Sequence, residues 1–495
     1  MLPSPAPDHL AEPGTLHEGA LRSSERVQLY LSFRRTGWLF ALATLSLASA
    51  AQLESATRQQ QLAREIFEQL VDMNTADSAA NVTGAVDAMA KRFRDAGFPE
   101  TDIHIGGDDP HFQNLVVRYR GTGARKPLLL LAHLDVVEAL RSDWSLDPFH
   151  FTEKDGYFYG RGTVDDKAEA ACWVANLIAY KQQGFKPDRD IIVALTSGEE
   201  SSKHEGVDWL VANHRDWIDA DLALNEGGDG AIRNGKKIAN YVQASEKVYY
   251  SLELKATNAG GHSSVPRKDN AIYELATALL KIANCNFPVE LSEVTKMYFE
   301  RTGEISTGPL AAAMREIAKD PKSQNAIETL SADPHENAMM RTTCVATRLN
   351  GGHADNALPQ TATAVVNCRF LPDDRPEPVV ETLRRLIADP GIQITDVNVP
   401  RIGTPSPLTP EFMKAIEQTT NAIWPGVPVI PTMGTGATDG RSLREAGIRC
   451  YGLSGFFLDA DDDREHGRDE RMPVQSFFDG QRFLFELVRK LAGGQ

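Results

Sequence analysis

The sequence predicts an α/β protein with a mostly parallel sheet in its larger domain and a second, smaller domain inserted into it. Strand-like and helix-like runs alternate from residue 52 to about residue 245, as in a parallel sheet covered by helices. The pattern then changes to half-buried strands and amphipathic helices. The alternation typical of a parallel sheet covered by helices returns after Pro400. At 495 residues the chain is also too long for one hydrophobic core.

Continuous apolar runs mark the buried strands of the larger domain. Residues 128–132 and the apolar run within 190–196 are typical of strands covered on both faces. Residues 165–183 carry apolar side chains on one stripe and precede Gly184, which favours a helix that ends there. The other expected elements are helices at 56–72, 82–96, 411–423 and 474–491, and strands at 221–224, 427–431 and 449–452.

The smaller domain is expected to be ferredoxin-like, with the order strand, helix, strand, strand, helix, strand. A less regular insertion, residues 287–341, interrupts it. We therefore expect a leader at 1–51, the larger domain at 52–245 and 403–495, and the inserted domain at 246–402. Its elements are expected at 248–257, 271–284, 342–349, 363–370, 378–388 and 392–399.

Composition excludes several classes of protein. Apolar residues make up 42% and charged residues 24%, which is ordinary globular usage and argues against disorder, collagen and a polytopic membrane protein. The net charge of −16 makes nucleic acid an unexpected partner. Five cysteines are too few and too scattered for a disulfide scaffold or a zinc ribbon.

The N-terminal region indicates export. Arg34 and Arg35 precede an apolar run, residues 38–51, that ends in small residues, as in a signal peptide. We expect a periplasmic or secreted protein, and the alternative is an uncleaved leader that anchors the chain to a membrane. The residues before the arginines are many for a signal peptide, but no methionine lies between Met1 and Met73 to offer a later start.

Side chains that can bind metal follow the predicted strands. His133 and Asp135 come directly after the strand at 128–132, where active sites of open α/β sheets gather. Residues two apart in a strand face the same way, so Asp135 can orient the imidazole of His133. Taken alone, the pair could equally lie on the surface without a function.

Adjacent glutamates follow the next strand. Glu199 and Glu200 repel each other unless a cation or a proton separates them. One can bind metal while the other acts as a general base. Glu226 likewise follows the strand at 221–224.

Two further residues are ambiguous alone and informative together. Asp165 follows Gly160-Arg161-Gly162 and opens a helix, where aspartate is usually a cap. His466 lies in a charged run that resembles a solvated loop. The combined set has two imidazoles and three carboxylates, which suits two zinc ions that share one bridging carboxylate. The candidate ligands are His133, Asp165, Glu200, Glu226 and His466.

From about residue 60 to its end the chain resembles the dinuclear zinc aminoacylase/carboxypeptidase family, which includes glutamate carboxypeptidase, carnosinase, acetylornithine deacetylase and succinyl-diaminopimelate desuccinylase. The resemblance implies a zinc-exopeptidase-like catalytic domain, an inserted lid and dimerisation domain, and two Zn²⁺ per subunit, with Mn²⁺ or Co²⁺ as alternatives. The motifs that carry it are His133-x-Asp135, Gly-Arg-Gly-x-x-Asp165-x-Lys167, Glu199-Glu200, Glu226-Gly227-Gly228 and His466-x-x-x-Glu470.

The resemblance also implies a role for each ligand. Asp165 would bridge the metals, with His133 and Glu226 completing one site. Glu200 and His466 would complete the other. Glu199 would be the general base, and Asp135 the partner of His133.

Substrate-binding residues are implied in the same way. His262, in a glycine turn where a structural role is the alternative, resembles the lid histidine that stabilises the oxyanion in the partner subunit. Asn356 and Arg369 resemble the lid residues that grip a free carboxylate. Gly436 and Thr438 lie in a loop that resembles one whose backbone N–H groups help to hold that carboxylate.

Cys344 and Cys368 lie symmetrically about residue 356 on two predicted hairpin strands. A symmetric hairpin places them opposite each other, so either a cross-strand disulfide or two buried thiols can result.

The function expected is that of a metal-dependent hydrolase, a carboxypeptidase or dipeptidase. It would cleave the amide bond next to a C-terminal residue with a free carboxylate, using water activated by Glu199. The alternative is an aminoacylase that acts on N-acyl amino acids with the same site. A non-catalytic metal- or peptide-binding protein is the remote alternative, against which Glu199 argues. We also expect a homodimer formed through the lid domain.

Overall fold

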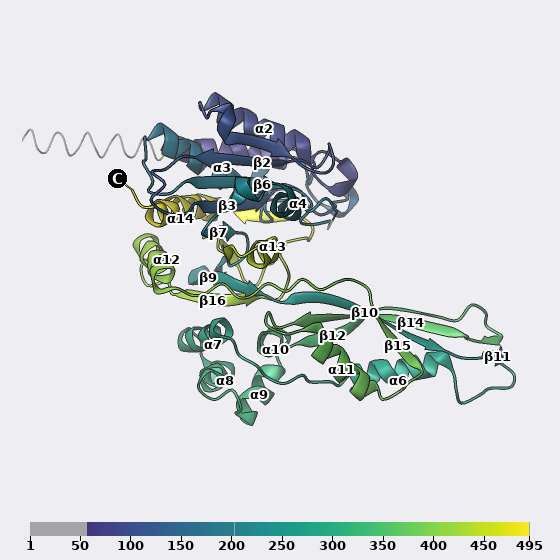
Figure 1. Ribbon diagram of the computed structural model, residues 1–495. Helices are drawn as coiled ribbons and strands as arrows, with labels where there is room; N and C mark the ends of the chain where they lie inside the picture. The colour runs from purple at the N-terminus through teal and green to yellow at the C-terminus, as the bar shows by residue number, and fades with distance from the viewer. Residues whose placement is uncertain (1–56, 202, 495) are drawn as a thin grey trace, which may run out of the picture. The chain divides into compact units, whose positions relative to one another are not determined.

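The computed structural model describes residues 57–201 and 203–494 (Figure 1). The predicted leader, residues 1–51, lies outside the described residues. None of the described helices is long and apolar enough to cross a membrane.

The larger sheet has ten strands among the described residues. Its strands are β1 Ile103–Gly106, β2 Asn114–Tyr119, β3 Leu128–His133, β6 Ile191–Thr196, β7 Leu222–Asn225, β8 Gly230–Arg233, β9 Lys236–Glu246, β16 Val429–Gly434, β17 Arg449–Gly452 and β18 Phe457–Asp459. They follow the order β1-β2-β6-β3-β7-β17-β9-β8-β18, and β16 pairs with β9. The central strands β6, β3, β7 and β17 are parallel, which confirms the predicted α/β fold with a mostly parallel sheet.

Helices cover both faces of this sheet. They are a helix at 57–71, α2 Val82–Asp95, α3 Lys167–Gln182, α4 Gly206–Asn213, α5 Arg215–Ile218, α12 Pro410–Ile423, α13 Gly440–Glu445 and α14 Val474–Ala492. Leu128 and Leu130 of β3 pack into the core that contains α2, α3 and α14, whereas Leu129 and Leu131 pack toward α4 and α13. Burial on both faces explains the continuous apolar run.

Helix α3 differs from the amphipathic helix that the sequence predicts. Every residue from Lys167 to Tyr180 is buried. Both α2 and α14 contact it, so no side of its first three turns faces water. A small antiparallel sheet joins distant segments of the chain, with strands β4 Thr152–Lys154, β5 Tyr157–Tyr159 and β19 Arg471–Pro473.

The second sheet has four antiparallel strands within the described chain, in the order β12-β14-β10-β15. Along the chain its elements are β10 Val248–Thr257, α6 Ala271–Ala283, β12 Thr343–Gly351, β14 Thr361–Phe370, α11 Pro376–Ile387 and β15 Ile392–Asp396. Helices α6 and α11 share one apolar core with the sheet (Figure 1). A short pair, β11 Gly261–His262 and β13 Ala357–Leu358, joins two of its loops.

The insertion after α6, expected to be irregular, is helical. It contains α7 Glu293–Ile305, α8 Gly308–Lys319, α9 Gln324–Ser331 and α10 Pro334–Met340. Phe299 of α7 packs with Ile430 and Met433 of β16 in a separate core. The Ser292 hydroxyl caps α7 in a capping box with Thr295, a start signal that the sequence carries.

Cys344 and Cys368 stand opposite each other on β12 and β14 and form a disulfide. Of the two outcomes left open by the sequence, the structure has the bonded one. Cys172, Cys285 and Cys450 are free.

Candidate metal centre

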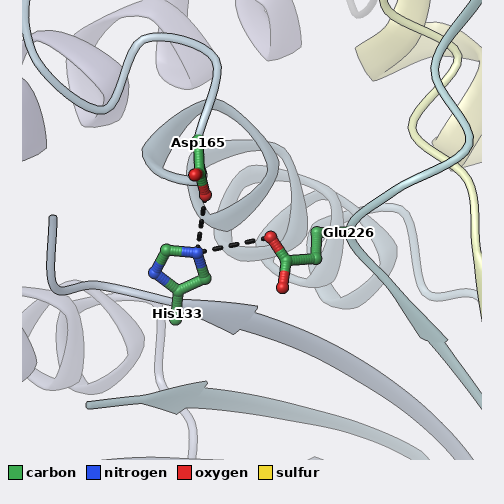
Figure 2. A group of neighbouring side chains, drawn as sticks. All are labelled: His133, Asp165 and Glu226. Atoms are coloured by element: carbon green, nitrogen blue, oxygen red, sulfur yellow. Dashed lines mark hydrogen bonds and ion pairs between the residues drawn. The ribbon is translucent and has the colours of Figure 1, made fainter. Parts of the chain in front are cut away.

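Three of the predicted ligands meet at the carboxyl end of the parallel strands (Figure 2). His133 is the last residue of β3, and Glu226 follows β7 directly. His133 Nε2 lies 2.7 Å from Asp165 Oδ1 and 3.4 Å from Glu226 Oε2. An imidazole nitrogen and two carboxylate oxygens therefore converge on one point.

The other two predicted ligands meet at the second oxygen of Asp165. His466 Nε2 lies 2.8 Å from Asp165 Oδ2 and 3.2 Å from Glu200 Oε2. Asp165 thus faces one imidazole with each of its carboxylate oxygens. This is the arrangement expected of a carboxylate that bridges two metal ions.

The structure adds one candidate ligand that the sequence did not single out. A carboxylate oxygen of Glu465 lies within 4.8 Å of the ligand atoms of Asp165 and His466, so the three could share an ion. Glu465 stands in an acidic run in which no residue is distinctive. Only the folded loop shows which member of that run faces Asp165.

The cluster concentrates negative charge in a buried site. Burial raises the pKa of Glu226 to about 7 and that of Glu465 to about 8. Burial also raises the pKa of Glu199, and the neighbouring Glu226 raises it further. Conversely, the hydrogen bond to Asp165 raises the pKa of His466 to about 11. So much buried carboxylate favours a cation in the site.

Further buried acid lies beside the cluster. Asp166 Oδ2 and Glu169 Oε1 are buried and have no hydrogen-bond partner, and both residues line the same cavity. Imidazole nitrogens and carboxylate oxygens are a donor set that zinc and other divalent ions accept. The residues present therefore fit a dinuclear centre.

The Gly-Arg-Gly loop places Asp165 against His466. Arg161 Nη1 pairs with Glu470 Oε2 at 2.6 Å, and its Nη2 donates to the main-chain oxygen of Gly467 at 2.9 Å. Glu470 Oε1 accepts the backbone N–H of Val164 at 2.7 Å. The sequence predicts no role for Arg161 or Glu470, although both lie in the motifs that carry the family resemblance.

Asp135 contacts His133 differently from the expectation. His133 Nδ1 lies 3.0 Å from the main-chain oxygen of Asp135, whereas the carboxylate oxygen Oδ1 is 3.7 Å away. The other oxygen, Oδ2, accepts the backbone N–H of Glu200 at 3.0 Å. Asp135 therefore orients the imidazole through its backbone and the Glu199-Glu200 turn through its carboxylate.

A cavity of about 330 Å³ opens onto the cluster. Glu199, Glu200, Gly436 and Thr438 line it together with Asp165. Four further residues on the wall are also predicted ligands or their neighbours: Glu226, Gly227, Gly228 and His466. The predicted base and the predicted carboxylate-binding loop thus share one chamber with four of the five predicted metal ligands.

Comparison with known proteins agrees with this geometry. Residues 129–490 match Peptidase family M20/M25/M40. The chain belongs to this peptidase family. Its relatives include the N-fatty-acyl-amino acid synthase/hydrolase PM20D1 of Xenopus tropicalis, 30% identical over 73% of this chain and 72% of that protein. They also include the probable carboxypeptidase S-like 2 of Dictyostelium discoideum, 29% identical over 76% of this chain and 74% of that protein.

Solved structures show the same fold. The M20 family metallo-carboxypeptidase Sso-CP2 from Sulfolobus solfataricus is 15% identical, with a TM-score of 0.65 over 86% of this chain and 98% of that one. Human carnosine dipeptidase 1 is 14% identical, with a TM-score of 0.59 over 89% of this chain and 99% of that one. The predicted family and enzyme class are therefore confirmed: the protein is a metal-dependent hydrolase of the M20 family.

The predicted lid residues of this M20 protein lie away from the chamber. His262 is exposed in β11, and Asn356 accepts the backbone N–H of Ser263 at its main-chain oxygen. Arg369 lies on β14. None of these three side chains lines the cavity in the described chain.

Thr438 also departs from its expected role. Its backbone N–H donates to Glu246 Oε2 at 2.7 Å, so that donor is already used within the protein. Gly436 has open space around its Cα, which leaves its backbone accessible to a ligand.

Proposed function

We propose that the protein hydrolyses the amide bond between an acyl group and the amine of a residue that carries a free carboxylate. One observation carries this proposal: Asp165 holds His133 and His466 on its two oxygens, 2.7 Å and 2.8 Å away, beside Glu199. The relatives' names support both substrate types, a peptide cleaved at its C-terminus and an N-acyl amino acid.

We propose two Zn²⁺ per subunit, with Mn²⁺ or Co²⁺ as substitutes. Asp165 would bridge the ions. His133 and Glu226 would hold one of them, and Glu200 and His466 the other. Divalent cations held there would act as Lewis acids that lower the pKa of water and polarise the scissile carbonyl.

The chain itself supplies the proton transfer. Glu199 takes a proton from the attacking water at its carboxylate and delivers it to the leaving nitrogen. Burial and the charge of Glu226 raise the pKa of Glu199, which suits a group that must hold the proton between these steps. Asp135 fixes the turn that carries Glu199 by accepting the Glu200 N–H at 3.0 Å.

Substrate binding is assigned to Arg369, Asn356 and the Gly436 backbone, which would hold the free carboxylate. His262 would stabilise the oxyanion from the partner subunit. Both assignments require the lid residues to approach a chamber that they do not line within a single described chain.

We propose a homodimer formed through the edge strand β12. In the described sheet β12 pairs only with β14, so its outer edge is free. Val345 and Leu349 on β12 are 61% and 72% exposed, and Tyr273 on the adjacent helix α6 is 63% exposed. An unpaired edge with apolar side chains is a surface that pairs with another chain. Sedimentation of wild type and Leu349→Glu tests this: a wild type that is fully active as a monomer contradicts both the dimer and the role of His262.

We also propose export to the periplasm or the medium, with an uncleaved membrane anchor as the alternative. The Cys344–Cys368 disulfide supports an oxidising compartment. N-terminal sequencing of the mature protein, with cell fractionation, distinguishes a cleaved leader from a retained one.

A combined metal and substrate assay tests the function. The purified protein is analysed for metal content and then offered dipeptides, the same dipeptides amidated, and short- and long-chain N-acyl amino acids. About two metal ions per chain, with cleavage only of compounds that have a free carboxylate, is the expected result. Preference for acylated amino acids over dipeptides selects the aminoacylase-type activity, whereas bound metal without any cleavage contradicts the proposal.

A further inference from the structure

Arg369 is held within the smaller sheet without an acidic partner. Its Nε donates to Asn367 Oδ1 at 3.3 Å, and its guanidinium carbon lies 4.6 Å from the centre of the Tyr249 ring. Its Nη1 is buried and has no hydrogen-bond acceptor. Among the described residues, no carboxylate forms an ion pair with it within 4.0 Å. The guanidinium therefore has a donor that only a ligand or water can satisfy.

Cationic side chains lie near Arg369. Burial lowers the pKa of Arg369, the neighbouring Tyr249 raises it, and the charge of Arg441 lowers it. Burial also lowers the pKa of Lys247, and there the charge of Arg369 adds to the effect. A half-buried guanidinium with no acidic partner in the described chain favours an anionic ligand, and a carboxylate matches its planar fork.

Three side chains on β10 and β14 form a frame beside the guanidinium: Tyr249, Ser251 and Asn367. Tyr249 stands directly opposite Arg369, and Ser251 directly opposite Asn367. Asn367 Nδ2 donates to Ser251 Oγ at 3.0 Å, and Ser251 Oγ donates to the Tyr249 hydroxyl at 3.2 Å. Asn367 and Ser251 thus link Arg369 to the hydroxyl of Tyr249, whose ring packs on Arg369.

We propose that Tyr249 is a positioning residue that orients Arg369 to receive the free carboxylate of the substrate. This inference rests on the proposed function, in which Arg369 binds that carboxylate. The face of the Tyr249 ring attracts the guanidinium cation and fixes the orientation of the guanidinium plane. The N–H donors in that plane stay available to a carboxylate. Tyr249, but not Arg369, lines a cavity of about 400 Å³ beside the frame. Its wall carries three cationic side chains, Lys247, Arg401 and Arg441, and two carboxylates, Glu205 and Glu246.

The test compares Tyr249→Leu, which removes the ring, with Tyr249→Phe, which keeps it. Each variant is assayed on an N-acyl amino acid that carries a free carboxylate and that the wild type hydrolyses. Tyr249→Leu should raise KM for the free acid about fivefold to tenfold with little change in kcat, within the range of one cation–π contact. Tyr249→Phe should stay within about twofold of wild type.

Arg369→Lys separates this inference from the proposed function. If Arg369→Lys leaves KM for the free acid unchanged, Arg369 does not bind the carboxylate and the proposed function of that residue is wrong. If Arg369→Lys raises KM but Tyr249→Leu does not, the positioning role of Tyr249 is wrong.

Two further outcomes test whether Tyr249 has a purely structural role. A Tyr249→Leu variant that loses kcat on the free acid while its KM stays at the wild-type value overturns the inference, because a residue that positions the carboxylate-binding arginine acts on substrate binding. If this variant does not fold, Asn367→Ala removes the other support of the frame. It should raise KM for the free acid, and an unchanged KM overturns the inference in that case.

Discussion

Arg161 and Glu470 form a buried ion pair, 2.6 Å from Nη1 to Oε2, between the loop that carries Asp165 and the loop that carries His466. The arginine also lies 5.1 Å from the centre of the Trp144 ring. The two loops are 309 residues apart in the sequence, and the Arg161–Glu470 ion pair holds them together. The spacing between the two halves of the metal centre therefore depends on residues that bind no metal themselves.

Arg161→Lys should weaken metal binding. Lysine keeps the charge but cannot bond Glu470 and the Gly467 carbonyl with one planar fork. Loss of a group that positions metal ligands typically lowers metal affinity about 10- to 100-fold. Zinc affinity measured by competition with a chelator checks this. Arg125→Lys is the matched control, because Arg125 also pairs with a carboxylate, that of Asp188, and donates to a main-chain oxygen, that of Leu491, but lies before the N-terminal end of β3. Equal affinity in the two variants would contradict the prediction.

Loss of the Cys344–Cys368 disulfide should destabilise the smaller sheet. The bond closes a loop with a sequence separation of 24 residues, which in the chain-entropy model contributes about 3 kcal/mol. The double variant Cys344→Ser/Cys368→Ser should unfold at lower denaturant concentration than wild type. Wild type with reductant should shift in the same direction. Mass spectrometry after alkylation, with and without reductant, counts the thiols, and an unchanged count shows that the bond is absent.

Strands β3 and β6 of the larger sheet, which could be predicted from the sequence, have a continuous apolar pattern, because they are buried on both faces. β3 is buried on both faces, so its continuous apolar run indicated the strand and placed His133 at its end. β9 was not predicted, because Asn240, Gln243 and Ser245 are buried polar residues that break any apolar pattern. Their burial depends on partners elsewhere in the chain, such as the Thr420 hydroxyl that bonds Asn240.

In the candidate site, too, some residues could be predicted from the sequence and others could not. Residues at strand ends could be assigned from the sequence, because the geometry of a parallel sheet brings those ends together. Glu465 could not be assigned, because it lies in an irregular loop where His466 and Asp469 adopt positive φ angles of 57° and 54°. Which acid faces Asp165 there depends on the path of that loop, which the Arg161–Glu470 pair helps to set.

Lys247 should make the stability of the protein depend on pH. Its ammonium donates to the main-chain oxygen of Arg341 at 2.7 Å, and burial lowers its pKa to about 7. The ordinary pKa of lysine is about 10.4, so between these values the unfolded chain binds the extra proton and unfolding takes one up. The free energy of unfolding should therefore rise with pH from about 7 upward, by at most about 1.4 kcal/mol per unit from this group.

Denaturant titrations of wild type and Lys247→Met between pH 7 and pH 9 measure this slope. The variant should lack the contribution of Lys247, so its free energy of unfolding should change less with pH. Lys268→Met, at an exposed position, is the control and should keep the wild-type slope. Parallel slopes in all three proteins would show that Lys247 does not lose its proton in this range.

Glu199→Gln should abolish turnover while leaving the metal centre loaded. The amide keeps the shape of the side chain but cannot accept a proton from water, and loss of a general base typically costs about 10²- to 10⁴-fold in kcat. Glu199 is absent from the close contacts of His133, His466 and Asp165, so metal content should stay at the wild-type value. The control Glu445→Gln changes an exposed glutamate on α13 and should keep full activity. Near-wild-type turnover by metal-loaded Glu199→Gln would mean that another group moves the proton, whereas loss of metal would make Glu199 a ligand.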